Sequence, residues 1–183
     1  MKTESTVMYV LRLALTLLAI TAVAAAALAG VNSITAPAID ALNAAKTQEA
    51  IEAVLPGGGE LMDNYTDNTG LVSKVYASET GYAVEVTPGG FNNTITMMVG
   101  VDKAGTVLGI SIVSHTETAG LGAVAAASTS AGEAFRGQFA GTSGSVSVTK
   151  DGGSLDAITG ATITSRAVCT GVNAALECVA AMG

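Results

Sequence analysis

The sequence predicts an α+β fold, in which an antiparallel sheet with flanking helices follows one N-terminal transmembrane helix. Three observations support this prediction. Residues 13–31 form an apolar run without a charged side chain. Runs of β-branched residues follow one another between residues 72 and 113, separated by short polar turns. Residues 165–182 repeat apolar side chains at helical spacing. Strands in direct succession, with helices before and after them, are typical of an antiparallel α+β domain.

The composition excludes several classes of protein. Of the 183 residues, 49% are hydrophobic and only 13% are charged, which excludes an intrinsically disordered chain. The formal net charge is −7 and no basic run is present, so we expect no nucleic-acid partner. Two cysteines and one histidine are too few for a zinc site, and we expect no metal site. Cys169 and Cys178 fall on opposite faces of one predicted helix, which favours two buried thiols over a disulfide.

The N-terminal apolar stretch is predicted to be a membrane anchor. Residues 7–31 are long enough to cross a hydrocarbon core of about 30 Å as a helix. Lys2 and Arg12 lie at its start and the next basic residue is Lys46, so the positive-inside rule predicts a cytoplasmic N-terminus in the cell membrane and an external domain. The alternative is a signal peptide cleaved after the Ala-Leu-Ala of residues 27–29. Both alternatives place the domain outside the cytoplasm.

The segments and elements are expected in the following order. Residues 1–6 are cytoplasmic, 7–31 form the anchor, 32–59 a connecting helix and linker, and 60–183 the external domain. Pro37 stands where a first helical residue often does and predicts a helix over residues 36–55, which the Pro-Gly-Gly-Gly run at 56–59 ends. The expected strands cover residues 72–76, 82–86, 94–101, 106–113 and 146–149. Residues 120–139 are compatible with a helix, and the last helix covers residues 165–182.

Residues 156–165 carry the most informative pattern. They form a turn of small residues that runs into a helix, and Gly160 and Ala161 leave room for a ligand to approach the backbone. Thr164 or Ser165 is the expected N-cap of that helix. The free amides of a helix start favour an anion, most often a phosphate. By itself the pattern therefore favours an ordinary capped helix start, with a phosphate site as the alternative.

The pattern Asp156-x-x-Thr159-Gly160-Ala161-Thr162 resembles the flavinylation motif of FMN-binding domains. In those domains the last threonine is bonded to FMN through a phosphoester. The resemblance implies that Thr162 is the acceptor of a covalent FMN, and that Asp156, Thr159, Gly160 and Ala161 belong to the same cofactor site.

A second block, residues 114–122, resembles the His-x-Glu-Thr-Pro-Gly-Leu-Gly loop of the same family, with Ala119 in place of the proline. The resemblance implies that five residues of this loop lie near the flavin. They are His115, Glu117, Thr118, Gly120 and Leu121. For His115, a hydrogen-bonded loop histidine without a cofactor role is the alternative.

Such domains occur in the G-type component of the Rnf electron-transport complex and in the C-type component of the sodium-translocating NADH:quinone reductase. The shortness of the chain favours the Rnf type. The resemblance implies an electron-carrying subunit, not catalytic alone, in a membrane-bound ion-translocating ferredoxin:NAD oxidoreductase. The implied partners are the other membrane and iron–sulfur or flavin subunits of the complex, and a flavin transferase for maturation. The span has no ionisable residue past Arg12, so ion translocation is expected in partner subunits.

Other functions remain as alternatives. The chain could be a C-type reductase component or another membrane-tethered external flavoprotein, or, in a different class, a tethered binding domain without a cofactor. Two enzyme classes fit poorly. Gly120-Leu121-Gly122 matches the glycine pattern of dinucleotide-binding folds, but residues 114–119 separate it from the preceding strand. A serine hydrolase would need a G-x-S-x-G motif and partners for His115, which the sequence lacks.

Overall fold

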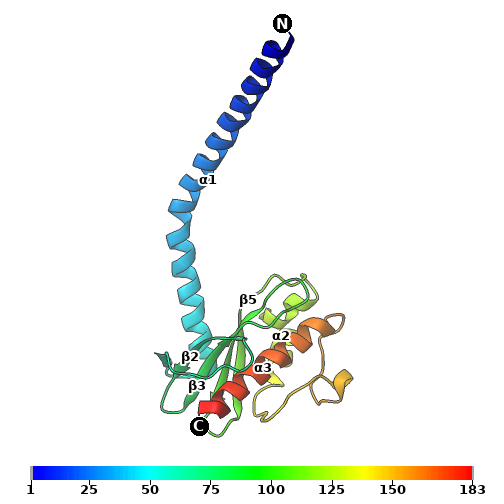
Figure 1. Cartoon of the computed structure of the whole chain (residues 1–183). Coiled ribbons are helices and arrows are strands. Elements are labelled where there is room, and N and C mark those ends of the chain that lie inside the picture. The colour runs from blue at the N-terminus through cyan, green and yellow to red at the C-terminus, as the bar shows by residue number, and fades with distance from the viewer. Residues whose placement is uncertain (1, 183) are drawn as a thin grey trace. The chain divides into compact units, whose positions relative to one another are not determined.

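The computed structural model describes residues 2–182 and divides into two compact units that meet between Ala45 and Lys46. The elements follow in the order α1, β1 to β5, η1, α2, η2 and α3, where η marks a short 3-10 helix (Figure 1). Helices and an antiparallel sheet occur together as predicted, so the α+β class is confirmed.

Helix α1 (Lys2–Val54) has the length and surface of a membrane-spanning helix. Its most apolar 18-residue window has a mean hydropathy of 2.3 and none of it is buried. Large apolar side chains along it are exposed, for example Leu18, Val23 and Ile34 at 64%, 71% and 77%. Exposing so much apolar surface to water is unfavourable, whereas a hydrocarbon environment removes that cost.

Pro37 lies inside α1 rather than at the start of a new helix. The separate helix predicted over residues 36–55 is therefore wrong, and these residues form the last part of α1. A proline removes one backbone hydrogen bond, and alanine-rich sequence on both sides keeps the helical backbone favourable around it. The segment boundaries proposed at residues 31 and 59 remain predictions.

The second unit is built on a five-stranded antiparallel sheet in which every strand pairs with its neighbours in sequence. The strands are β1 (Glu60–Met62), β2 (Val72–Ala77), β3 (Gly81–Val86), β4 (Thr96–Asp102) and β5 (Val107–Ser114). The predicted hairpin joins β4 to β5, and the Asp102 carboxylate accepts the amides of Ala104 and Thr106 at 2.9 and 2.7 Å. Gly105 completes this turn with a φ of 81°, which glycine adopts without strain.

One face of the sheet packs against α3 (Thr162–Met182) and α2 (Ser130–Gly137), as Figure 1 shows for α3. Met97 and Val99 of β4 point into this core. The two cysteines lie in the same core as free thiols, as predicted, and burial raises the pKa of Cys169 to about 11.

The other face of the sheet packs against the end of α1. Ile51 and Val54 form a second buried cluster with Met98 of β4, whose side chain alternates with those of Met97 and Val99. Gly100 permits this approach, because a Cβ atom at this position would lie only 2.9 Å from the Cβ of Val54. The sheet is thus covered on both faces.

Two segments differ from the prediction. The stretch 120–139 is not one helix but divides into η1 (Gly122–Ala126) and α2, because the Thr129 hydroxyl accepts the Gly132 amide and starts a new helix. Residues 146–149 form no strand of the sheet. The Asn173 side chain on α3 pairs with both the amide and the carbonyl of Val146, so a side chain takes the place of a neighbouring strand.

We predict that Gly100→Ala destabilises the folded domain by about 1–3 kcal/mol, because the added methyl group forces the end of α1 away from the sheet. Thermal or chemical unfolding of the full chain in detergent measures this change. Gly109 is the matched control, since it pairs directly with Gly100 on β5 and a Cβ there would meet nothing within 4 Å. Equal stability of Gly100→Ala and Gly109→Ala would contradict the packing of residues 46–54 on the sheet.

Candidate functional site

A pocket of about 300 Å³ lies where four segments meet: the loop between β3 and β4, the loop after β5, the short 3-10 helix η2 (Thr149–Asp151), and the start of α3 with the turn before it. The large apolar side chains at the pocket are exposed, namely Phe91, Leu121 and Ile163. Two of its polar residues, Glu117 and Thr164, are buried. The full lining consists of Phe91, Glu117, Thr118, Leu121, Gly122, Lys150, Gly160, Ala161, Thr162, Ile163 and Thr164.

The buried carboxylate of Glu117 joins the two loops to α3. One oxygen accepts the backbone amide of Asn92 at 3.0 Å, and the other accepts the hydroxyl of Thr164 at the start of α3. The Asn92 side chain also donates to the carbonyl of Thr116 at 2.9 Å. The two loops and α3 are therefore held together by one acidic side chain and its neighbours.

Two glycines make room for this carboxylate. A Cβ atom at Gly90 would lie 2.5 Å from one Glu117 oxygen, and a Cβ at Gly122 would lie 2.6 Å from the other. Both distances are well inside van der Waals contact, so any side chain at either position would displace the carboxylate. The glycine pattern at residues 120–122 thus has a packing reason at Gly122 and needs no dinucleotide.

Burial raises the pKa of Glu117, but hydrogen bonds from Thr164, Asn92 and Phe91, with the nearby His115, outweigh burial and leave the pKa below its ordinary value. Glu117 is therefore ionised at neutral pH. Such a carboxylate stabilises the folded state above the pKa that it has in the unfolded chain, and this stabilisation is lost as the pH falls through the lower folded-state pKa.

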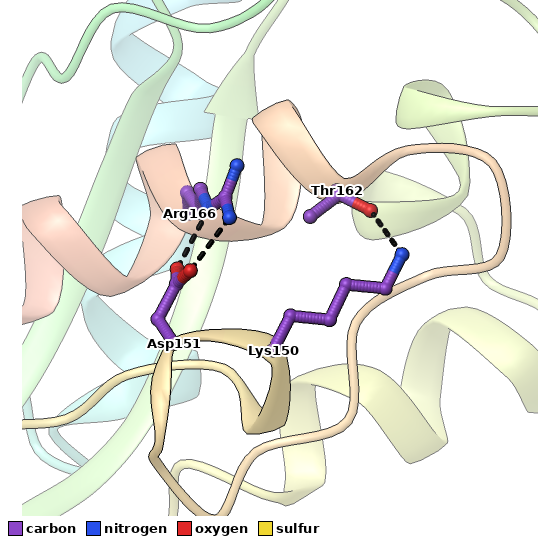
Figure 2. Close-up of polar contacts among 4 residues, drawn as sticks. All are labelled: Lys150, Asp151, Thr162 and Arg166. Carbon is purple, nitrogen blue, oxygen red and sulfur yellow. Dashed lines mark hydrogen bonds and ion pairs between the residues drawn. The ribbon is translucent and has the colours of Figure 1, made fainter.

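Thr162 is the first residue of α3 and is half-buried at the pocket. The ammonium group of Lys150 donates to its hydroxyl oxygen at 3.1 Å, as Figure 2 shows. Beside this contact, the Asp151 carboxylate accepts two hydrogen bonds from Arg166, each of 2.6 Å. The side chain of Thr162 is thus the hydroxyl in the pocket that lies next to a positive charge.

The predicted N-caps are wrong. The helix starts before them, so that Thr164 and Ser165 lie in its first turn and are buried. The Thr164 hydroxyl donates a hydrogen bond to the Glu117 carboxylate. The Ser165 hydroxyl donates to the Ala161 carbonyl at 3.0 Å and accepts the Ile158 amide at 3.0 Å. Ser165 therefore fixes the turn that precedes the helix.

The structure brings together six of the ten residues expected at the site. Those that line the pocket are Glu117, Thr118, Leu121, Gly160, Ala161 and Thr162. His115 does not line the pocket but contacts a residue that does, because its Nδ1 accepts the Glu117 amide at 3.2 Å. Gly120, Asp156 and Thr159 instead line a separate hollow of about 600 Å³ beside α2.

Five lining residues were not expected from the sequence: Phe91, Gly122, Lys150, Ile163 and Thr164. Gly122 and Ile163 are adjacent to expected positions. Lys150 had one local signal, since it is the only basic residue between Arg136 and Arg166 in a stretch rich in glycine, serine and threonine. No local pattern in the sequence identifies Phe91, which reaches the site through the turn at residues 90–93.

Comparison with known proteins gives a family. Residues 90–177, which include every lining residue of the pocket, match the FMN-binding domain. The G-type component of the ion-translocating oxidoreductase complex of Methanosarcina acetivorans is 31% identical over 159 residues, which cover 80% of this chain and 82% of the relative. The component of the same name from Vibrio vulnificus is 43% identical over 104 residues. The G-type component of the proton-translocating ferredoxin:NAD(+) oxidoreductase complex of Clostridium ljungdahlii is 40% identical over 111 residues.

The extent of these matches differs. The matched region spans 55% of this chain and 49% of the Vibrio relative, and 56% of this chain and 57% of the Clostridium relative. The chain therefore spans about half the length of these two relatives and most of the Methanosarcina relative.

We predict that Glu117→Gln lowers the free energy of unfolding at pH 7 by about 1–3 kcal/mol, because the amide cannot accept both hydrogen bonds. The difference from the wild type should shrink as the pH falls from about 4.5, the ordinary pKa of the unfolded chain's glutamate, through the lower pKa that the carboxylate has in the folded state. Chemical denaturation at a series of pH values measures this. Glu79→Gln, at an exposed turn, serves as the control and should follow the wild type throughout. A difference that is constant with pH would exclude the ionised network.

Proposed function

The chain belongs to the family of G-type components of ion-translocating oxidoreductase complexes, and we propose that it is an electron-carrying subunit with FMN bonded to Thr162. The match to the FMN-binding domain supports the cofactor, and the position of one hydroxyl supports the bond. FMN, when bound, supplies redox chemistry in steps of one or two electrons, and the protein supplies its attachment and its electrostatic surroundings.

Thr162 is chosen as the acceptor because the hydroxyl groups of residues 159–165 differ in burial and in the pocket that they face. Thr164 and Ser165 are buried and engaged in hydrogen bonds within the protein. Thr159 is exposed but faces the other hollow. Thr162 alone among them is half-buried in the pocket, where an incoming group can reach its oxygen.

The attachment requires a flavin transferase that uses FAD as donor. The hydroxyl oxygen of Thr162 forms a bond to the phosphorus on the FMN side, the phosphoanhydride bond of FAD breaks, AMP leaves and the hydroxyl proton is released. The product is a phosphodiester that keeps one negative charge. Lys150 lies beside that position, and the free amides at the start of α3 favour an anion there.

The rest of the pocket fits the flavin part of the cofactor. A flat aromatic ring can cover the exposed side chains of Phe91, Leu121 and Ile163, which removes their apolar surface from water. Thr118 offers a polar group to the edge of such a ring. Glu117 is instead a positioning residue, since its two oxygens already hold the loops and α3 together.

We also propose that the subunit works in an Rnf-type membrane complex, with its domain on the extracytoplasmic side. The apolar helix α1 and the relatives' names indicate a membrane-anchored protein. The extracytoplasmic location is inferred from the positive-inside rule, because Lys2 and Arg12 lie at the start of the apolar stretch. Other subunits of the complex would exchange electrons with this one and carry the ion, because the span has no ionisable side chain after Arg12.

Thr162→Ala should abolish covalent flavin while the domain still folds, because the position is half-buried and outside the core. The chain is produced together with a flavin transferase, denatured and washed, and then analysed by absorption and peptide mass. Thr170→Ala is the control at an exposed hydroxyl outside the motif and should carry one FMN. An FMN adduct on another residue, or one that persists in Thr162→Ala, contradicts the assignment, and a colourless wild type favours a binding domain without cofactor.

Protease added to spheroplasts should digest the domain while a cytoplasmic marker protein stays intact, because the domain is proposed to face outward. N-terminal sequencing of the mature chain complements this measurement. A mature chain that begins at Gly30 would replace the anchor by a cleaved signal peptide. A domain that is digested only after the membrane is opened would reverse the proposed orientation.

A further inference from the structure

We propose that the 3-10 turn η2 (Thr149–Asp151), held to α3 by the Asp151–Arg166 ion pair, positions Lys150 as the cation that binds the phosphodiester formed at Thr162. This inference depends on the proposed attachment at Thr162. It assigns a role to a segment outside both sequence blocks that predicted the site.

The contact itself is specific to one atom. The Lys150 ammonium lies 3.1 Å from the Thr162 hydroxyl oxygen, which is the oxygen that would be esterified (Figure 2). A protonated lysine does not remove the hydroxyl proton, so its contribution is to hold the hydroxyl and to place a positive charge next to it. After esterification the same charge faces the phosphodiester oxygens.

The negative charge in the pocket favours a cation at this position. The chain has a formal net charge of −7, and the ionised carboxylate of Glu117 lies in the same pocket. A phosphodiester adds a second negative charge near the first. Among the lining residues, all of which belong to the described part of the chain, Lys150 carries the one positive side chain.

The ion pair explains why a flexible, exposed lysine points to this oxygen. Arg166 lies one helical turn after Thr162, so both residues present their side chains on the same side of α3. Adjacent residues of η2 meet them: Lys150 contacts Thr162, and Asp151 accepts both hydrogen bonds from Arg166 (Figure 2). The hydrogen bonds from Arg166 lower the pKa of Asp151, so the pair stays charged at neutral pH.

The backbone of η2 is also fixed at both ends. The Thr149 amide donates to the Leu155 carbonyl at 2.8 Å, and the Asp151 amide donates to the Val148 carbonyl at 2.9 Å. Gly152 closes the turn with a φ of 85°, and no Cβ fits at Gly153 against the carbonyl of Ser147. The turn is therefore a rigid base for Lys150, and the ion pair fixes its register on α3.

The first test measures how fast the full-length chain in detergent gains covalent FMN from FAD and a flavin transferase. Lys150→Ala should lower the initial rate at least about tenfold with an unchanged melting temperature, and Lys150→Arg should recover most of the rate because the charge is kept. Lys103→Ala, at the exposed β4–β5 turn, is the control and should react as the wild type. A wild-type rate in Lys150→Ala overturns this inference alone, whereas a wild type without FMN on Thr162 overturns the attachment proposal as well.

The second test separates positioning from charge. Asp151→Asn should also slow attachment, and the exchanged pair Asp151→Arg with Arg166→Asp should restore it, because the ion pair forms again in reverse. Failure of the exchanged pair to restore a rate that Asp151→Asn has lowered overturns the positioning role of the ion pair.

The third test needs no variant. An amine-acylating reagent should modify Lys150 several-fold more slowly in the FMN-loaded chain than in the unmodified chain, while Lys103 reacts equally in both. Peptide mass analysis of the same digest measures both lysines. Equal modification of Lys150 in the two forms overturns the contact with the phosphodiester.

Discussion

The pocket depends on the two hydrogen bonds that the buried carboxylate of Glu117 accepts. The carboxylate joins the loop that contains Asn92 to the helix that contains Thr164. Neither partner is near Glu117 in the sequence. The carboxylate must be ionised to accept both hydrogen bonds, and glycines at residues 90 and 122 must leave it space. The position of Thr162 at the pocket follows, because Thr164 lies in the same first turn of α3.

The sheet determines where this interaction can form. Because β4 is antiparallel to both neighbours, the end of β3, the start of β4 and the end of β5 lie at one edge, and Thr96 pairs with Ser114 there. The loops that carry Asn92 and Glu117 therefore leave the sheet side by side. Helix α3 covers one face of the sheet and brings its first turn to the same edge. The end of α1 packs on the opposite face, so the packing of residues 46–54 and the pocket use different surfaces of the domain.

Elements with local signals were predicted well from the sequence. The strands of the sheet between residues 72 and 114 lie within two residues of their expected bounds, because β-branched runs and turn residues are local. Tertiary contacts account for the failures. Thr164 has the side chain of an N-cap but bonds to Glu117, 47 residues earlier. Residues 146–149 alternate as a strand does, yet Asn173 takes the backbone groups of Val146. Lys150 reaches the site only because η2 folds against α3, which no local pattern contains.

The exposed rim of the pocket has a consequence for the exchange of electrons. A dissociable cofactor is retained by burial, and pockets for such ligands commonly enclose about 70–90% of the ligand surface. A cofactor bonded to Thr162, as proposed, would not depend on enclosure for retention. Phe91, Leu121 and Ile163 could then stay at an open surface, where a redox partner would approach the flavin edge closely without a lid that must first move. The proposed attachment would thus separate the retention of the cofactor from its accessibility.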